Sequence, residues 1–283
     1  MRRSGAELDP DSGSDLLTER TPRVAAARKL LRRAARVEAG RFLVEGVRPV
    51  HDALTWADEG PGRVHDLFLT DAVADRHPDL ERRADAAGVR VARITDKAAA
   101  GLSDTVTPQG VAAVCTTVAV DLDTALPDSP RLVTVLVGVA DPGNAGTVVR
   151  TSDAAGADAV VVAGNAVDLH NPKCVRASMG SLFHVPVAAE RDVDAVLDAL
   201  RARGLTLLAA DGRGDTVLDA GADALLGAPT AWLFGSEAHG LDDRTAEAAD
   251  HRVRVPIHGR AESLNLATAA AVCLYASARV HHR

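Results

Sequence analysis

Aromatic residues are scarce in this chain: Phe, Trp and Tyr together make up 2% of its 283 residues. A surface that binds nucleic-acid bases by stacking needs several aromatic rings, so stacking cannot dominate such an interaction here. Cysteine is also rare, with three widely spaced residues at positions 115, 174 and 273. This odd, scattered set indicates reduced thiols and excludes both a disulfide framework and a cysteine zinc site.

Long apolar runs are missing as well. No run approaches the roughly 20 residues that cross a bilayer. The segment after Arg2 and Arg3 is polar and supplies no apolar core of a signal peptide. We therefore expect a cytoplasmic protein without a membrane partner. The net charge of −7 argues against uniform coating of nucleic acid.

Basic residues nevertheless gather in one segment. Between Arg20 and Arg41, eight arginines and lysines face a single acid, Glu38. Such a basic stripe can contact phosphates even in an acidic protein, although a solvated helix face has the same composition. The residues predicted to contact a nucleic acid are Arg28, Lys29, Arg32, Arg33, Arg36 and Arg41.

The order of short apolar runs predicts two α/β domains. Residues 1–18 are polar and rich in Gly, Ser and Asp, which is typical of a disordered tail. Strands and helices alternate over 19–120, beginning with a helix over 22–37, and predict a compact first domain. Two prolines and three acids mark 121–130 as the linker. From 131 to 283 the alternation is more regular and favours a mostly parallel sheet covered on both faces.

Three loops of the second domain follow predicted strands, where ligands of parallel sheets bind. The first, Ala140–Arg150, is rich in glycine, but its spacing fits neither a dinucleotide fingerprint nor a Walker loop. The second, Trp232–Leu241, contains Gly-x-Glu-x-x-Gly and presents Glu237 at a strand tip. The third follows a strand that ends at Pro256, and Ser263 is predicted to cap the helix after it.

Each loop alone has an ordinary explanation. Turn glycines are common, a loop carboxylate such as Glu237 is usually solvated, and helix capping alone accounts for Ser263. The three loops share the same strand–loop–helix order, however, and the start of a helix offers free N–H groups to a polar ligand. We therefore expect them to build one site together.

In their order and chemistry these motifs resemble those of the SpoU (TrmH-like) 2′-O-ribose RNA methyltransferases of the SPOUT superfamily. The first family motif, Asn-x-Gly…Arg, is matched by Asn144, Gly146 and Arg150. The other matched positions are Ser178, Gly180, Pro186, Val187, Gly235, Glu237, Gly240, Pro256, Gly259, Ser263, Leu264 and Asn265, with Val255 in place of a common Ile. The resemblance spans about 131–279. Over a shorter stretch, Arg41–Gly46 and Thr107–Gly110 are similar to the substrate-binding domain that many members carry.

The resemblance implies a C-terminal SPOUT α/β domain with a deep trefoil knot, preceded by a small α/β RNA-binding domain. It also implies S-adenosylmethionine as the cofactor and a homodimer formed through the knotted domain. The residues implied to hold the cofactor are Gly235, Val255, Ile257, Leu264 and Asn265. The residues implied to act in catalysis are Asn144, Arg150, Glu237, Ser263 and Asn265. No metal is expected, because the sulfonium electrophile already carries its charge.

A guanidinium is effectively never deprotonated in proteins, so we expect Arg150 to clamp a phosphate and activate the 2′-hydroxyl electrostatically and not to act as a base. The favoured substrate is 23S ribosomal RNA. Two alternatives stay open: a tRNA 2′-O-methyltransferase, and a non-catalytic RNA-binding or assembly factor. No motif encodes the modified nucleotide, the proton acceptor, or whether the modification is housekeeping or confers antibiotic resistance.

Overall fold

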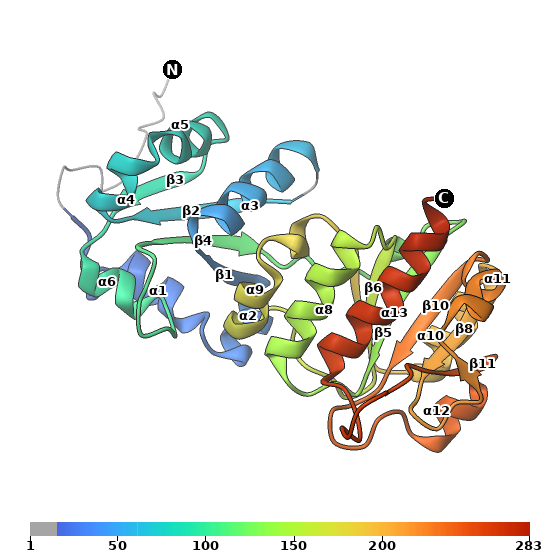
Figure 1. Ribbon diagram of the computed structural model, residues 1–283. Coiled ribbons are helices and arrows are strands. Elements are labelled where there is room, and N and C mark those ends of the chain that lie inside the picture. Colours follow the sequence, from blue (N-terminus) through green and yellow to red (C-terminus); the bar gives the residue numbers. More distant parts are fainter. Residues whose placement is uncertain (1–15, 61) are drawn as a thin grey trace.

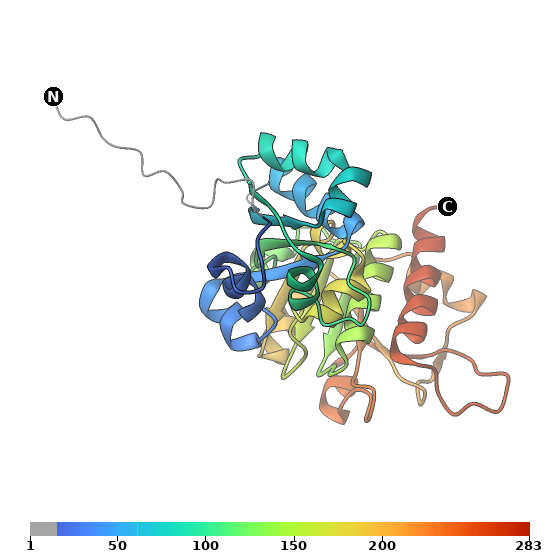
Figure 2. The same ribbon diagram turned by 90° about the vertical axis from the view of Figure 1, so that its left-hand side faces the viewer.

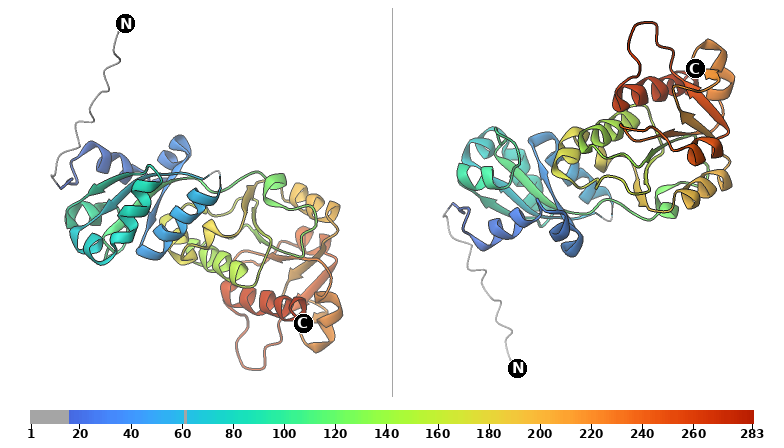
Figure 3. Two further views of the ribbon diagram at one scale, coloured as in Figure 1. Left: turned by 90° about the horizontal axis from the view of Figure 1, so that it is seen from above. Right: turned by 90° about the horizontal axis from the view of Figure 1, so that it is seen from below.

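The computed structural model describes residues 16–60 and 62–283, which form two α/β domains (Figures 1 and 3). Most of the predicted tail, residues 1–15, lies outside the described residues. The prediction is wrong for the end of that segment. Leu17 is buried in the core of the first domain, and its N–H donates to the Arg93 carbonyl over 2.9 Å. An apolar side chain with a place in the core outweighs the polar composition around it.

The first domain is built on a mixed sheet of four strands, in which β4 is antiparallel to both of its neighbours. In spatial order the strands are β1 (Arg41–Glu45), β4 (Val111–Thr116), β2 (Val64–Leu69) and β3 (Arg90–Arg93). Helices pack on both faces of this sheet (Figure 2). They are α1 (Pro22–Lys29), α2 (Arg33–Ala39), α3 (Val47–Glu59), α4 (Asp71–Arg76), α5 (Pro78–Ala86) and α6 (Asp96–Gly101).

The single helix predicted over 22–37 is two helices in the structure, α1 and α2. The break exposes backbone carbonyls that would otherwise accept helical hydrogen bonds. The Arg36 guanidinium satisfies two of them, because Nη1 donates to the Leu30 and Leu31 carbonyls over 2.9 Å each. The buried Arg36 side chain therefore stabilises the turn between α1 and α2, which the helical pattern of the sequence does not predict.

The second domain contains a sheet of seven strands in which every pairing is parallel, as predicted. In spatial order the strands are β7 (Val187–Glu190), β6 (Ala159–Ala163), β5 (Leu132–Val137), β10 (Thr230–Phe234), β8 (Thr206–Ala210), β11 (His251–Arg254) and β9 (Thr216–Val217). The central strands are continuous apolar runs that are buried on both faces, as parallel strands require. This sheet, with the smaller domain before it, confirms the predicted fold class, while the trefoil knot stays a prediction.

Helices cover both faces of the parallel sheet. One face carries α8 (Pro142–Ala154), α9 (Pro172–Ser178), α11 (Asp223–Leu226) and α13 (Leu266–His281), with the short turns η1 (Ser181–Phe183) and η2 (Ala220–Ala222). The other face carries α7 (Leu122–Ala125), α10 (Val193–Ala202) and α12 (Asp243–Ala248). No helix within the described ranges is long and apolar enough to cross a membrane.

The predicted linker, 121–130, contains α7 and is packed against the second domain. Ala125 and Leu126 are buried in the same core as α10, and the Val120 N–H donates to the Val187 carbonyl over 3.0 Å. The connection is therefore anchored to the edge of the parallel sheet.

The direction of the chain reverses at the centre of this sheet. From β5 the chain runs outward through β6 and β7 and then crosses to the other half of the sheet, where it forms β8 and the edge strand β9. It returns to β10 beside β5 and ends with β11 between β8 and β9. A parallel sheet opens a crevice at the carboxyl ends of the two strands where the direction changes. The fold therefore predicts a ligand site between the ends of β5 and β10.

A buried ion pair joins the two domains. Arg36 is 3% exposed, and its Nη2 and Nε donate to Asp168 Oδ2 over 2.7 and 3.1 Å. Burial alone would raise the pKa of Asp168, but hydrogen bonds from His170 and Arg36 hold that pKa well below its usual range. Apolar contacts seal the joint, because the Phe183 ring lies 6.1 Å from the Phe42 ring and 5.4 Å from the Trp56 ring, centroid to centroid.

Replacing Arg36 by Ala is expected to lower the free energy of unfolding by about 3 kcal/mol, since it leaves a half-buried carboxylate and two carbonyls without a donor. Urea unfolding at neutral pH measures the change. The matched control is Arg33→Ala, which removes an exposed arginine of the same helix and is expected to alter stability by less than about 0.5 kcal/mol. Equal effects of the two substitutions would contradict a structural role for Arg36.

Candidate functional site

One carboxylate, that of Glu237, joins the loops that follow β5 and β10. Glu237 follows β10, and its two oxygens accept hydrogen bonds from the loop after β5. The donors are the Ala140 N–H over 3.3 Å, the Asp141 N–H over 3.2 Å and the Asn144 Nδ2 over 3.0 Å. Burial alone would raise the pKa of Glu237, but these donors lower it below its ordinary value. The carboxylate is therefore ionised at neutral pH and acts as an acceptor.

The third loop joins the same network through Asn265. Its Nδ2 donates to Asn144 Oδ1 over 3.1 Å, while its Oδ1 accepts from the N–H groups of Ala267 and Thr268. Asn265 is thus the N-cap of α13, and the prediction of Ser263 as the cap is wrong by two residues. An amide serves better than a hydroxyl here, because it can cap the helix with its oxygen and bind Asn144 with its nitrogen.

The start of α8 is fixed by Asp141. Its Oδ1 accepts from the Asn144 N–H over 2.8 Å, and Lys173 at the start of α9 binds Oδ2 over 2.6 Å. The hydrogen bonds from Lys173 and Asn144 lower the pKa of Asp141. Gly146 allows α8 and α9 to pack closely, since a Cβ there would lie 2.3 Å from the Cys174 carbonyl oxygen.

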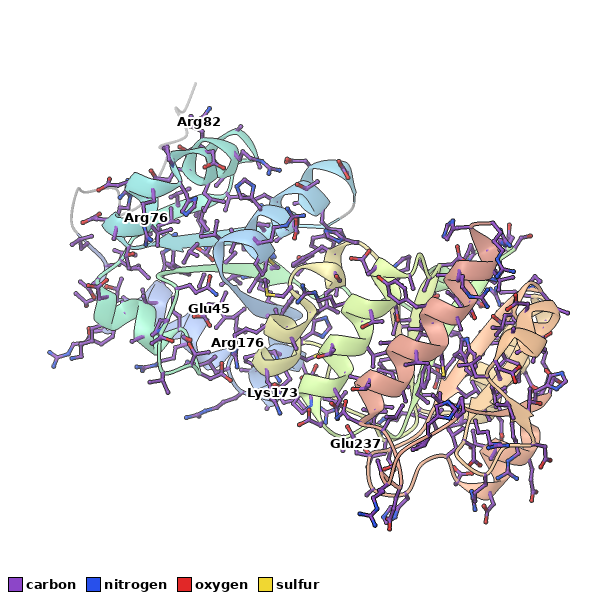
Figure 4. All side chains as sticks on the ribbon, viewed as in Figure 1. Glu45, Arg76, Arg82, Lys173, Arg176 and Glu237 are labelled. Atoms are coloured by element: carbon purple, nitrogen blue, oxygen red, sulfur yellow. The ribbon has the colours of Figure 1, made fainter. Side chains whose placement is uncertain are left out.

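A pocket of about 540 Å³ lies beside this network. Its volume is in the range of small-molecule and cofactor sites. Gly235, Val255, Ile257, Leu264 and Asn265, the five residues predicted to hold the cofactor, all line it. Ser263 and Glu237 line it as well, so the second and third loops border this cavity. The first loop does not line it but is attached to both through the hydrogen bonds of Asn144. Figure 4 shows Glu237 at the base of α8 and α13, where these loops meet.

Sequence reasoning missed two charged residues of this pocket, Glu262 and Asp211. Asp211 follows β8 and lies beside Gly212 in the pocket wall. Burial would raise its pKa, but hydrogen bonds from the Arg213 N–H over 2.8 Å and from Arg252 Nη2 over 2.6 Å lower it. A carboxylate directly after a predicted parallel strand is the signal that would have identified it.

Arg150 does not join the network of its own chain. It is exposed on α8, and its side chain makes no hydrogen bond or ion pair with any other described residue. Six residues separate it from Asn144, which turns its side chain about 120° away around the helix axis. The structure therefore brings together Asn144, Glu237 and Asn265 but leaves Arg150 on the outer surface.

The six residues of the basic stripe that are predicted to contact RNA divide into two groups. Arg28, Lys29, Arg32 and Arg33 are exposed, and Arg41 is half-buried. Arg36 is the exception, because its guanidinium is buried and every part of it binds Asp168 or a backbone carbonyl. Its prediction as an RNA contact is therefore wrong, since a buried and fully bonded cation cannot reach a phosphate.

Comparison with protein families matches both domains. Residues 131–275 match the SpoU rRNA Methylase family, and residues 21–113 match the MRM3-like substrate binding domain. The parallel sheet, the site at its switch point and this match define an RNA 2′-O-methyltransferase. The chain belongs to the SpoU rRNA methylase family.

Curated relatives match along nearly the whole chain. The 23S rRNA (guanosine(2553)-2′-O)-methyltransferase RlmP of Bacillus subtilis is 36% identical over 88% of this chain and 92% of its own length. The 23S rRNA (uridine(2479)-2′-O)-methyltransferase of Streptomyces viridochromogenes is 33% identical over 99% of this chain and 96% of its own. The match therefore includes both domains.

Solved structures agree with the fold. The SpoU methyltransferase AviRb from Streptomyces viridochromogenes, in complex with the cofactor AdoMet, has a TM-score of 0.80 at 31% identity and covers 91% of this chain and 98% of its own. The AdoMet-bound rRNA methyltransferase from Sinorhizobium meliloti has a TM-score of 0.78 at 29% identity, with 92% and 95% covered.

Replacing Gly146 by Ala is expected to lower the free energy of unfolding by about 1–3 kcal/mol, because the added methyl group forces α8 and α9 apart. Urea unfolding checks the change. Thr147→Ala, at the next and exposed position of α8, is the matched control and is expected to stay within about 0.5 kcal/mol of the wild type. A Gly146→Ala protein as stable as this control would mean that the helices tolerate a wider separation.

Proposed function

We propose that this protein transfers the methyl group of S-adenosylmethionine to a ribose 2′-hydroxyl of 23S ribosomal RNA. The observation that carries the proposal is the Asn144–Glu237–Asn265 network, which joins three family motifs beside one pocket at the carboxyl ends of β8, β10 and β11. The names of the curated relatives favour 23S rRNA over tRNA as the substrate. The cytoplasmic location expected from the sequence is part of the same proposal.

The pocket has the character that the cofactor requires. Its charged lining residues within the described ranges are three acids, Asp211, Glu237 and Glu262. These acids suit the positive sulfonium of S-adenosylmethionine, while Val255, Ile257 and Leu264 offer apolar contacts. When bound, the cofactor supplies an activated methyl group. Backbone groups around Gly235 and Leu264 hold it, and Asn265 closes the pocket beside the network.

The network residues position the reaction, and none of them accepts the proton in this proposal. Glu237 is ionised and engaged by three donors, so it fixes the two strand ends relative to each other. Asn144 uses its amide nitrogen toward Glu237 and its oxygen toward Asn265, which leaves little freedom for another role. Ser263 stands exposed in the pocket wall, where its hydroxyl can bind the ribose.

Arg150 is proposed to bind a phosphate of the RNA and to stabilise the developing oxyanion of the 2′-hydroxyl. A permanently charged, planar guanidinium with several N–H donors suits phosphate, and its field lowers the pKa of a nearby hydroxyl. The exposed position of Arg150 on α8, without an acidic partner among the described residues, keeps the guanidinium available for this role.

The same exposed surface supports a homodimer as part of the proposal. Helix α13 runs beside α8 and presents Val272 and Tyr275 to solvent, 41% and 53% exposed. The loop before α13 stands out from the body of the protein, with Ile257 and Leu264 exposed (Figures 2 and 3). A second copy packed on this face would bury these apolar groups in a twofold interface. It would also bring Arg150 of one protomer toward the pocket of its partner.

The protein is expected to behave in light scattering as a particle of twice the 29.4 kDa chain mass. Tyr275→Asp is expected to give a monomer with little methyl transfer, because a buried carboxylate without a partner is costly. Val37→Asp places the same charge on an exposed valine of the first domain and is expected to stay dimeric. An active wild-type monomer would refute the shared site.

Arg150→Ala is expected to lower the rate of methyl transfer at least about a hundredfold. Loss of one donor to the transition state has an effect of this size. Labelled S-adenosylmethionine with a 23S rRNA transcript, and separately with tRNA, measures this. Titration calorimetry is expected to show unchanged cofactor affinity.

The matched control is Arg131→Ala, which removes an exposed arginine just before β5 and is expected to keep full activity. If Arg150→Ala kept its turnover but lost affinity for the cofactor, the role proposed for Arg150 in binding phosphate and activating the hydroxyl would be wrong. Transfer to tRNA alone would favour the second substrate class.

A further inference from the structure

The loop between α6 and β4, residues 103–109, is held in shape by a single carboxylate. Glu45, at the end of β1, accepts a hydrogen bond from Ser103 Oγ over 2.8 Å with one oxygen. Its other oxygen accepts from the Gln109 N–H over 3.2 Å. Ser103 Oγ also accepts from the Thr105 N–H over 3.0 Å. Both ends of the loop are therefore fastened to the same side chain, and this segment is called the clamped loop below.

The clamped loop presents an apolar tip to water. Val106 is 99% exposed. It and its neighbours Thr105 and Thr107 are β-branched, so their side chains have few rotamers. A single exposed valine needs no explanation by itself. Here it stands on a loop that is fixed at both ends, so the tip is offered in a defined position.

Two groups of polar contacts, both anchored on α9, lie between this loop and the Glu237 network. Asp104 of the clamped loop pairs with Arg176 of α9 in the second domain. Arg176 lies three residues after Lys173, on the same side of α9. Lys173 binds Asp141, whose N–H donates to Glu237. Figure 4 shows Glu45, Arg176, Lys173 and Glu237 following one another along one side of the molecule, across both domains.

The chemistry along this side suits an RNA strand. Lys173 and Arg176 are cations between the loop and the pocket. Each pairs with one acid of this chain but, unlike Arg36, keeps part of its side chain in solvent. Arg28 of the basic stripe lies against Gly101 just before the loop. Cations bind phosphates, whereas an exposed isopropyl group can lie against the face of an unstacked base or enter a base step as a wedge.

We infer that the clamped loop is an RNA-contacting element, and that Val106 contacts a base in the strand that flanks the methylated nucleotide. The inference rests on the proposed function, because it takes RNA as the substrate. It adds a specific contact of the first domain that composition and charge do not indicate. Glu45 and Arg176 act as positioning residues that fix the loop relative to the pocket.

Val106→Asp tests the contact, because it places a negative charge at the tip without disturbing any buried group. The probe is an in vitro transcript of bacterial 23S rRNA, and filter binding at fixed salt measures its affinity directly. We expect affinity to fall about tenfold in Val106→Asp and about threefold in Val106→Ala, as for loss of one small apolar contact. Calorimetry is expected to show the same affinity for S-adenosylmethionine in every variant.

Arg82→Gln is the matched control. It changes the net charge by the same amount on the same domain, but Arg82 is exposed on α5, at the far end from α9 (Figure 4). Its RNA affinity is expected to stay within twofold of the wild type. Equal affinities of Val106→Asp and Arg82→Gln would overturn the inference.

Binding and methylation separate the inference from the proposed function. A wild-type protein that binds the transcript but does not methylate it would refute the proposed function, while weaker binding by Val106→Asp would still support the loop. A wild-type protein that binds no rRNA would refute both. With methylation present, Val106→Asp is expected to raise KM for RNA and leave kcat within twofold, which a merely destabilised protein would not do.

Discussion

The site depends on the attachment of three loops to one another by Glu237 and its donors. Parallel strands β5 and β10 end side by side, but nothing in the sheet itself fixes the loops beyond their ends. The carboxylate of Glu237 does so by accepting from two backbone N–H groups and the Asn144 amide. Asn265 then connects Asn144 to the N-terminus of α13. Because each side chain is bound on both sides, the pocket is formed before any ligand enters, which lowers the entropic cost of binding.

Much of this arrangement could be predicted from the sequence. The apolar runs separated by helices specify a parallel sheet, and residues at the strand ends, such as Glu237 and Asn265, then fall at one edge of it. The errors have identifiable physical causes. A hydroxyl and an amide both cap helices, so Ser263 and Asn265 could not be distinguished without the Asn144 partner. The break between α1 and α2 depends on a cation that binds carbonyls five and six residues earlier in the chain, a contact that periodicity does not encode.

Charge in the basic stripe has two different uses. Five of its eight members are exposed to solvent, whereas Arg36 is bound within the joint between the domains. Residue type alone cannot separate the two, since both uses favour arginine for its many donors. The same joint absorbs three of the seven aromatic residues, Phe42, Trp56 and Phe183. Because these three rings pack at the joint, few aromatic side chains remain for the surface.

The two tryptophans report on different parts of the molecule. Trp56 is half-buried and packs against Phe183, where the domains meet. Trp232 is fully buried in β10, and its indole N–H donates to Ser277 of α13 over 3.0 Å. Intrinsic emission from a protein with Phe at position 56 would therefore follow the packing of α13 on the sheet, and emission from one with Phe at position 232 would follow separation of the domains. Each domain therefore contains one tryptophan whose fluorescence can be followed separately.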